Sequence, residues 1–168
     1  ETGKNLVSAQ SPAEELEMVA SQPGWAEQHP DLWWEHVSLA VKQCLHKAGV
    51  TSDRIKAIGI AYQMHGLVAV DKEGKPVRSA IIWCDSRAVD YGNQAFKELG
   101  ETYCLSHFLN SPGNFTASKL KWIKENEPEV YNRIHKIMLP GDYIAYKLTG
   151  EIATTDTGLS EGIFWDYA

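Results

Sequence analysis

The stretch IKAIGIAYQMHGLVAV, residues 55–70, sets two apolar runs on either side of a short polar segment. Residues 55–62 are rich in isoleucine and alanine with little alternation, which predicts a buried strand. Residues 67–70 predict a second strand. A strand that enters a plain solvent loop usually meets Asn, Asp, Gly or Pro, but here it meets glutamine, methionine and histidine. We therefore expect the QMHG segment, residues 63–66, to line a small polar site.

Working outward from this stretch, the chain predicts strands and helices in alternation. Pro30 and Asp31 open a helix in which apolar side chains recur at helical spacing, and Gly49 ends it. The other predicted elements are helices at 86–99, 116–126, 128–134 and 140–148, strands at 5–10, 77–83 and 137–139, a turn at 71–75, and loops at 11–28, 51–53 and 151–168. This order predicts an α/β fold with a mixed sheet flanked by helices, as in actin-like or ribonuclease-H-like domains.

Length and composition limit the class of protein. The chain has 168 residues, of which 43% are hydrophobic and 23% charged, so it can form one domain with a core and is neither disordered nor fibrous. A net charge of -6 without a basic run argues against nucleic acid as a partner, and the apolar runs are too short for a membrane span. Three cysteines without metal-ligand spacing predict free thiols in a reducing, cytoplasmic setting and no zinc site.

The first residues suggest a chain that continues beyond its printed start. Glu1-Thr2-Gly3-Lys4 is similar to the turn at 71–75, but only the second of these turns has a strand on both sides. We expect the chain to be a piece of a longer protein whose first strand is missing.

Three consecutive side chains of the QMHG segment are candidates for ligand contact. On a strand, alternation would send Gln63 and His65 to one face and Met64 to the other. A histidine can donate to or accept from a hydroxyl group near neutral pH, which suits a polyol ligand. The alternative is a strand end with a packed histidine and a core methionine.

A second candidate group, Trp83-Cys84-Asp85-Ser86-Arg87, ends the next strand and should lie beside Gln63 to His65 if both strands share a sheet. Trp83 offers a flat apolar wall of the kind that sugars stack against. Asp85 and Arg87 either contact a ligand, or form an ion pair while Asp85 caps the following helix.

The stretch NFTASKLKWIKEN, residues 114–126, is the third candidate. Asn114 stands at the start of the predicted helix, where it can face a ligand or act as a cap. Lys119, Lys121 and Lys124 are expected on a solvated helix face. The chain contains neither of the glycine-rich phosphate-binding patterns, G-x-x-x-x-G-K-[ST] or G-x-G-x-x-G.

Together these stretches resemble the N-terminal domain of the FGGY family of carbohydrate kinases. The resemblance rests on five motifs in order, which are PGWAEQHP (23–30), QMHG (63–66), IIWCDSR (81–87), FTASKLKW (115–122) and GDYIAYKLTG (141–150). Within the family, Gln-Met-His-Gly is most similar to the xylulose kinases, whereas glycerol kinases have arginine and glutamate in place of Met64 and His65.

The resemblance implies transfer of the γ-phosphate of ATP, with Mg²⁺, to a keto-pentose, giving D-xylulose 5-phosphate from D-xylulose. It implies two actin-like domains, with the sugar held mostly by the first and ATP by the second, and it allows a homodimer. The substrate-binding residues that it implies include Gln63, Met64 and His65. It also implies that Trp83 forms an apolar wall and that Asn114 stands at a sugar-facing position. Asp85 and Arg87 match a motif pair that supports the site.

The chain also departs from the family pattern. The phosphate-contacting Asp-x-Gly-Thr-like segment is expected before Glu1 and the catalytic aspartate after Ala168, while Asp142 is assigned a structural role. We therefore expect residues 1–168 to be a partial sugar-binding domain without catalytic or metal-binding residues and inactive alone. The alternatives are a kinase for another substrate, such as glycerol, gluconate or ribulose, and a non-catalytic actin-like binding module.

Overall fold

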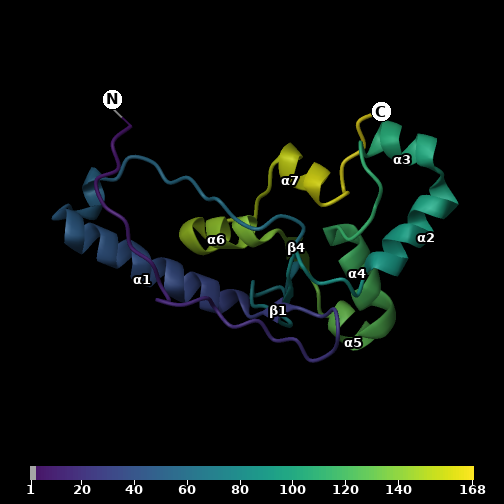
Figure 1. The fold of residues 1–168 in the computed structure, drawn as a ribbon, viewed down its shortest axis with the longest axis horizontal. Helices are drawn as coiled ribbons and strands as arrows, with labels where there is room; N and C mark the ends of the chain where they lie inside the picture. Colours follow the sequence, from purple (N-terminus) through teal and green to yellow (C-terminus); the bar gives the residue numbers. More distant parts are fainter. Residues whose placement is uncertain (1–2) are drawn as a thin grey trace.

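Seven α-helices and four short strands form the part of the chain that the computed structural model describes, residues 3–168 (Figure 1). In chain order the elements are β1 (Glu27–Gln28), α1 (Pro30–Ala48), the 3₁₀ turn Ser52–Arg54, β2 (Val68–Val70), β3 (Ala80–Ile81), α2 (Val89–Leu99), α3 (Glu101–His107), α4 (Thr116–Asn126), α5 (Pro128–Tyr131), β4 (Lys136–Met138), α6 (Pro140–Thr149) and α7 (Asp156–Glu161). The predicted α/β class is confirmed.

The strands form two antiparallel pairs. β1 pairs with β3, with Glu27 opposite Ile81, and β2 pairs with β4, with Val68 opposite Met138. A bridge between Leu67 and Ile81 joins the two pairs. The sheet of the described residues is thus smaller than the mixed sheet expected, and its pairings are all antiparallel.

The predicted turn between residues 71 and 75 is confirmed. The Asp71 amide donates to the Lys75 carbonyl at 2.9 Å, and the Asp71 carboxylate accepts from the amides of Glu73 and Lys75. These bonds close the loop between β2 and the chain that runs back towards β3, because an aspartate side chain can satisfy amides that a tight turn leaves without carbonyl partners.

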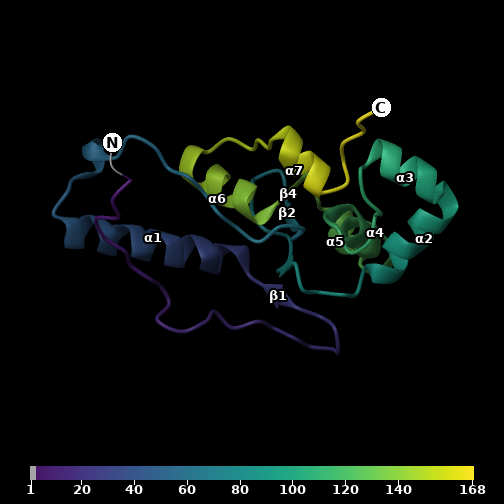
Figure 2. The same cartoon turned by 45° about the horizontal axis from the view of Figure 1, so that its top comes forward.

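Helices α1 and α6 lie side by side (Figures 1 and 2). Pro30 begins α1 and Gly49, at φ +63°, ends it, as the sequence predicts. The Tyr143 hydroxyl of α6 donates to the Asp31 carboxylate of α1 at 2.6 Å. This hydrogen bond ties the first turns of the two helices together.

The core has two adjoining clusters, one on each side of the strands. The first contains Leu67, Ile81, Ala88, Trp122 and Ile123, and the second contains Val68, Val70, Ala80, Met138 and Tyr143. Since Leu67 and Val68 are neighbours on one chain segment, alternation sends them into different clusters. The strands therefore support α4 on one side and α6 on the other.

The predicted strand at 55–62 is not formed. The segment is extended but has no strand partner among residues 3–168, and Ile55 and Ile58 are 47% and 65% exposed. It borders an apolar groove of about 600 Å³ that α1 and α6 also line, through Val37 and Ile144 among others. A strand needs a neighbouring backbone to bond with, and this segment finds none here.

Other local predictions also need correction. Residues 5–10 form no strand, and Leu6 is 80% exposed. The suggested hairpin tip at the start includes Glu1 and Thr2, which lie outside the described residues. The predicted loop at 151–168 contains α7, whose first turn is capped by Thr155, with its hydroxyl accepting from the Gly158 amide at 3.0 Å.

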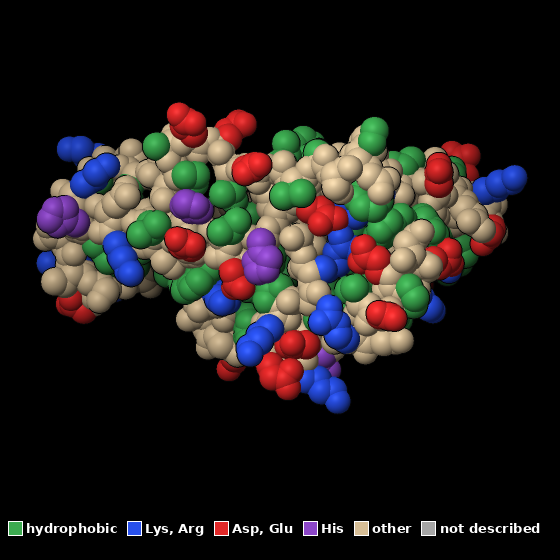
Figure 3. All heavy atoms as spheres, turned by 90° about the horizontal axis from the view of Figure 1, so that it is seen from below, with side chains coloured by type: hydrophobic (Ala, Val, Ile, Leu, Met, Phe, Trp, Pro, Cys, Tyr) green, Lys and Arg blue, Asp and Glu red, His purple; other side chains and the backbone are tan. Residues whose placement is uncertain are grey.

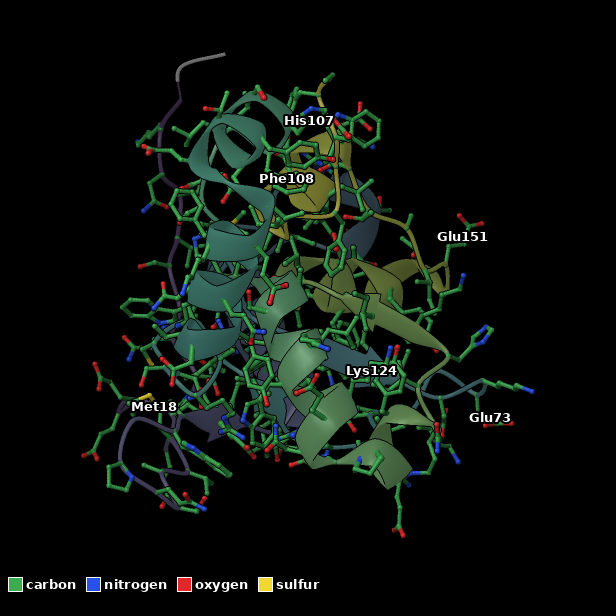
Figure 4. All side chains as sticks on the ribbon, turned by 90° about the vertical axis from the view of Figure 1, so that its right-hand side faces the viewer. Met18, Glu73, His107, Phe108, Lys124 and Glu151 are labelled. Carbon is green, nitrogen blue, oxygen red and sulfur yellow. The ribbon has the colours of Figure 1, made fainter. Side chains whose placement is uncertain are left out.

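Helix α3 was not predicted and ends at His107, beside the C-terminal segment (Figure 4). The Tyr167 amide donates to the His107 carbonyl at 2.8 Å, and the His107 ring contacts the Asp166 carboxylate at the same distance. These bonds hold the end of the chain against α3.

The surface carries charges of both signs. Figure 3 shows acidic and basic side chains interspersed on the face that it presents. Among the helices of residues 3–168, none combines the length and the apolar character that crossing a membrane would require.

Candidate functional site

The predicted meeting of the QMHG segment with the Trp83 segment is confirmed. The Trp83 amide donates to the side-chain oxygen of Gln63 at 2.8 Å. A third loop joins them, because the side-chain amide of Asn114 donates to the carbonyl of Asp85. Three loops distant in sequence therefore converge at one place.

The QMHG segment is a bend and not the end of a strand. His65 has φ +63°, in the left-handed region that most residues avoid. Gly66 packs so closely on the start of α6 that a Cβ there would lie 2.6 Å from Cγ of Pro140. Strand alternation between Gln63, Met64 and His65 was therefore the wrong basis for their directions.

The His65 imidazole lies between two elements from the second half of the chain. Its ring meets the edge of Phe115 with ring centres 4.4 Å apart, and its Nδ1 lies 3.3 Å from the carbonyl oxygen of Glu161 at the end of α7. Because a carbonyl can only accept, the tautomer that this contact selects carries its hydrogen on Nδ1 and leaves Nε2 as an acceptor. The side chain is 32% exposed, so a ligand can reach it.

Trp83 stays accessible at the same place. It is 59% exposed, although its backbone amide is fixed by Gln63. Met64 is partly buried in the adjoining bend. A large exposed indole held by a rigid backbone is suited to stacking against the apolar face of a sugar.

Asp85 and Arg87 form a buried ion pair. Their side chains are 0% and 1% exposed, and the closest oxygen and nitrogen lie 2.7 Å apart. The Asp85 carboxylate also accepts from the amide of Ala26 at 2.6 Å and from that of Arg87 at 2.9 Å. Neither side chain offers surface to a ligand, so of the two roles left open for this pair the geometry favours the ion pair that supports the loops over contact with a ligand.

Arg87 extends this pairing to the segment before α1. Its guanidinium carbon lies 3.7 Å from the ring centre of Trp25, and its nitrogen contacts the Glu27 carboxylate at 2.7 Å. Glu27 is also paired with Arg78. The alternative role predicted for Asp85, a cap on the next helix, is not observed, since α2 begins at Val89 without a side-chain cap.

Asn114 has one unsatisfied polar atom. Its Oδ1 is buried and has no hydrogen-bond partner among the described residues. It does not cap α4, whose cap position is Phe115. Buried acceptors are normally satisfied, so this unsatisfied oxygen, on a loop that Lys119 joins to the His65 loop, indicates a place for a donor from a ligand.

Lys119 is the residue that the sequence interpretation placed wrongly. Lys121 is exposed as predicted, and so is Lys124, which Figure 4 labels, but Lys119 is 0% exposed. The signal was present in the spacing, because Thr116, Lys119 and Ile123 follow one face of α4 and all three are buried.

The Lys119 ammonium group donates to the carbonyls of His65 at 3.0 Å and Asn114 at 2.8 Å. Burial lowers the pKa of Lys119 to about 8, and the Asp85 carboxylate partly opposes this shift. The Lys119 side chain therefore links the loop that carries His65 to the loop that carries Asn114.

Asp142 has the structural role expected of it. Its carboxylate accepts from the Leu139 amide at 3.2 Å at the start of α6, and burial raises its pKa. Within residues 3–168 no group of three or more His, Cys, Asp or Glu side chains is placed to hold a metal ion.

Comparison with known proteins agrees with this arrangement. The sequence model of the FGGY family of carbohydrate kinases, N-terminal domain, matches residues 2–167. The xylulose kinase of Escherichia coli K12 is 34% identical over 160 residues, which cover 95% of this chain and 32% of that protein. The xylulose kinase of Staphylococcus xylosus is 40% identical over 132 residues, covering 78% and 27%.

Among solved structures, the xylulose kinase of Rhodospirillum rubrum matches with a TM-score of 0.80 at 27% identity, covering 90% of this chain and 31% of that one. This similarity confirms the actin-like fold that the motifs implied. The chain spans about a third of the length of these relatives. Family match, sequence identity and fold agree, and this chain belongs to the FGGY family of carbohydrate kinases.

Proposed function

We propose that this chain is the sugar-binding part of an ATP-dependent kinase that converts D-xylulose to D-xylulose 5-phosphate. The observation that carries the proposal is that hydrogen bonds join the three loops that carry His65, the exposed Trp83 and Asn114 with its unsatisfied oxygen. Similarity to proteins named as xylulose kinases supports the choice of sugar.

The three groups suit a polyol. Nε2 of His65 and Oδ1 of Asn114 are both acceptors, and each can take a hydrogen bond from a sugar hydroxyl. The Trp83 indole offers an apolar face. A few directional polar groups beside an aromatic wall fix the orientation of a small ligand, and orientation supplies much of the rate in phosphoryl transfer.

The chemistry requires partners that the described residues do not provide. A sugar hydroxyl oxygen bonds to the terminal phosphorus of ATP, the bond to the bridging oxygen breaks, ADP leaves, and the hydroxyl proton passes to a base. Residues 3–168 hold no group of three or more His, Cys, Asp or Glu side chains placed for a metal ion, and the sequence contains neither of the two glycine-rich phosphate-binding patterns. We assign ATP, Mg²⁺ and the base to a part of the protein outside this chain.

We propose the same division for the fold, with residues 1–168 as a partial N-terminal domain that lacks a first strand and an ATP-binding domain. The exposed segment at 55–62 and the apolar groove beside it support this division, because both would be covered by further strands. The chain alone is expected to show no turnover.

The test is release of ADP by the longer protein with ATP, Mg²⁺ and a panel of D-xylulose, L-xylulose, D-ribulose, L-ribulose, D-gluconate and glycerol. Preferred turnover of D-xylulose is expected. Preference for another member of the panel would overturn the assignment of the sugar. If the protein turned over none of them, the kinase proposal would give way to a non-catalytic binding module.

A further inference from the structure

We propose that Lys119 is a positioning residue of the sugar site, whose buried ammonium group fixes the distance between the loop that carries His65 and the loop that carries Asn114. This inference rests on the proposed function for its kinetic meaning. Its geometry stands independently, on two hydrogen bonds from one ammonium group to two loops that lie about fifty residues apart in sequence.

A fully buried lysine needs a physical reason. Lysine is almost never fully buried unless it is paired, because an ammonium group loses strong hydration. No carboxylate pairs with Lys119 in the described residues, and the nearby Asp85 is occupied by Arg87 and by two backbone amides. Its partners are instead the carbonyls of His65 and Asn114.

The first of these carbonyls belongs to a strained residue. His65 adopts φ +63°, which a residue with a side chain adopts only when its surroundings hold it there. Lys119 holds its carbonyl, and Thr116 on the same face of α4 contacts the carbonyl of Gly66 at 3.4 Å. The direction of the imidazole thus depends on α4 through the backbone.

The second carbonyl belongs to Asn114, directly before α4. With its carbonyl held by Lys119 and its side-chain nitrogen held by Asp85, the Asn114 oxygen has a fixed direction. One ammonium group therefore sets the relative positions of the two acceptors proposed to bind sugar hydroxyls. A charged donor is suited to this, because charge-assisted hydrogen bonds are shorter and stronger than neutral ones.

Kinetic measurements distinguish a positioning role of Lys119 from a general effect on stability. In Lys119→Met the chain keeps its length and apolar packing but loses all donors. We expect the Michaelis constant for the sugar to rise at least about tenfold, because displaced contacts weaken binding strongly, while that for ATP stays within about twofold. Lys119→Arg keeps the charge and is expected to recover part of the loss.

The matched control is Lys121→Met, two residues along the same helix, where the lysine side chain is 54% exposed. The Michaelis constants of Lys121→Met for sugar and ATP should equal those of the unsubstituted protein. An unchanged sugar constant in a folded Lys119→Met protein would overturn the proposal, and so would equal losses for sugar and ATP. The unsubstituted protein in the same assays reports on the proposed function separately, through its preference for D-xylulose.

If Lys119→Met does not fold, the pH dependence of the Michaelis constant for the sugar tests the proposal instead. Besides the His65 and Asn114 loops, the charged or titratable groups that face Lys119 are Asp85, Cys84 and Arg87. Because the pKa of Lys119 is about 8, the ammonium group loses its charge as the pH rises from 7 to 9.5. The sugar constant should then rise about threefold in the unsubstituted protein, since neutral donors bond more weakly.

Lys119→Arg cannot lose its charge in this range, so its profile should be flat. Parallel profiles for the two proteins would overturn the proposal, since the titration would then belong to another group. A readout without turnover uses ¹H–¹⁵N spectra of Lys119→Arg, where shifts are expected at the amides of 64–66 and 114–116. Spectra unchanged at both loops would contradict the linkage even if no sugar were phosphorylated.

Discussion

His65 shows how one residue can join backbone strain to ligand contact. Its carbonyl is held by Lys119, its ring lies on Phe115, and its Nδ1 faces the Glu161 carbonyl. Each contact comes from the second half of the chain. The left-handed backbone at φ +63° is therefore imposed by packing around the site and is not a local preference of histidine.

Two substitutions at this position separate strain from function. His65→Ala keeps a Cβ in the left-handed region, while His65→Gly removes it, so the glycine protein should be more stable than the alanine protein by about 1 kcal/mol. Both should lose sugar affinity by about tenfold or more. Urea unfolding and sugar saturation curves measure the two effects.

The control for this pair is His135→Ala, because the His135 side chain is exposed and its backbone amide donates to Val70, at the end of β2 that is farther along the chain from His65. It should leave sugar affinity unchanged. Equal stability of His65→Ala and His65→Gly would refute the claim of strain, and unaltered sugar affinity in both would remove His65 from the site.

Prediction from sequence is most successful where one residue type determines the backbone conformation at its own position. The turn at 71–75, the proline that begins α1 and the glycine that ends it were all indicated by residues acting on their own backbone. Trp83 is exposed, as a wall for a ligand would have to be. Sequence reasoning could not place Lys119, because a lysine on a helix is taken to be solvated unless the partners that bury it are known.

At the scale of elements, residues from three of the family motifs contact one another. Asp85 and Arg87 follow β3, Glu27 belongs to β1, and Trp122 belongs to α4, with its ring centre 4.9 Å from the Arg87 guanidinium. These residues lie in three of the motifs that the sequence analysis quoted as one family pattern. Their shared role is to hold the loops of the site on the core.

Arg87→Met tests this network. Removing one partner leaves the Asp85 carboxylate buried without compensation, so the free energy of unfolding should fall by about 3–5 kcal/mol. Arg87→Lys should recover only part of this loss, because a lysine cannot reproduce the flat guanidinium over Trp25. Urea denaturation followed by tryptophan fluorescence gives both values.

The exposed ion pair of Lys121 with Glu125 is the matched comparison, and Glu125→Gln should lower the free energy of unfolding far less than Arg87→Met, because water screens an exposed pair. If Arg87→Met cost no more than Glu125→Gln, the buried network would not be what holds these elements together.

Elements that depend on a distant partner were the ones predicted least well. Helices α1, α4 and α6 follow from periodicity and end signals, and β4 from its apolar run. The segment at 55–62 has the composition of a buried strand but finds no neighbouring strand within residues 3–168. Composition describes what a strand needs, while its formation depends on a second backbone. Helix α7 is short, and its capping residue Thr155 lies in the segment at 151–168 that the sequence predicts as a loop.

At the scale of the whole molecule, the packed core and the apolar groove lined by α1 and α6 differ in how completely the described residues cover them. The loops around His65 rest on a packed core, while the segment at 55–62 that leads to them is exposed. If further strands cover this segment in the longer protein, they also stiffen the approach to the site.

Hydrogen exchange tests that arrangement. Amides of 57–61 should exchange within seconds in the chain alone and at least about a hundredfold more slowly in the longer protein, because pairing protects backbone amides. Amides of Val68–Val70, already paired with β4, should be protected in both. Equal exchange at 57–61 in the two proteins would show that nothing covers this segment.

The central claim is that the three loops around His65 form the sugar site. The most direct measurement is titration of the longer protein with D-xylulose, without nucleotide, while the ring signals of His65 and the indole signal of Trp83 are followed by NMR. The account predicts that both signals shift and saturate with one dissociation constant, while the ring signal of His135 stays in place. Turnover of D-xylulose by a protein whose His65 and Trp83 signals do not move would contradict it.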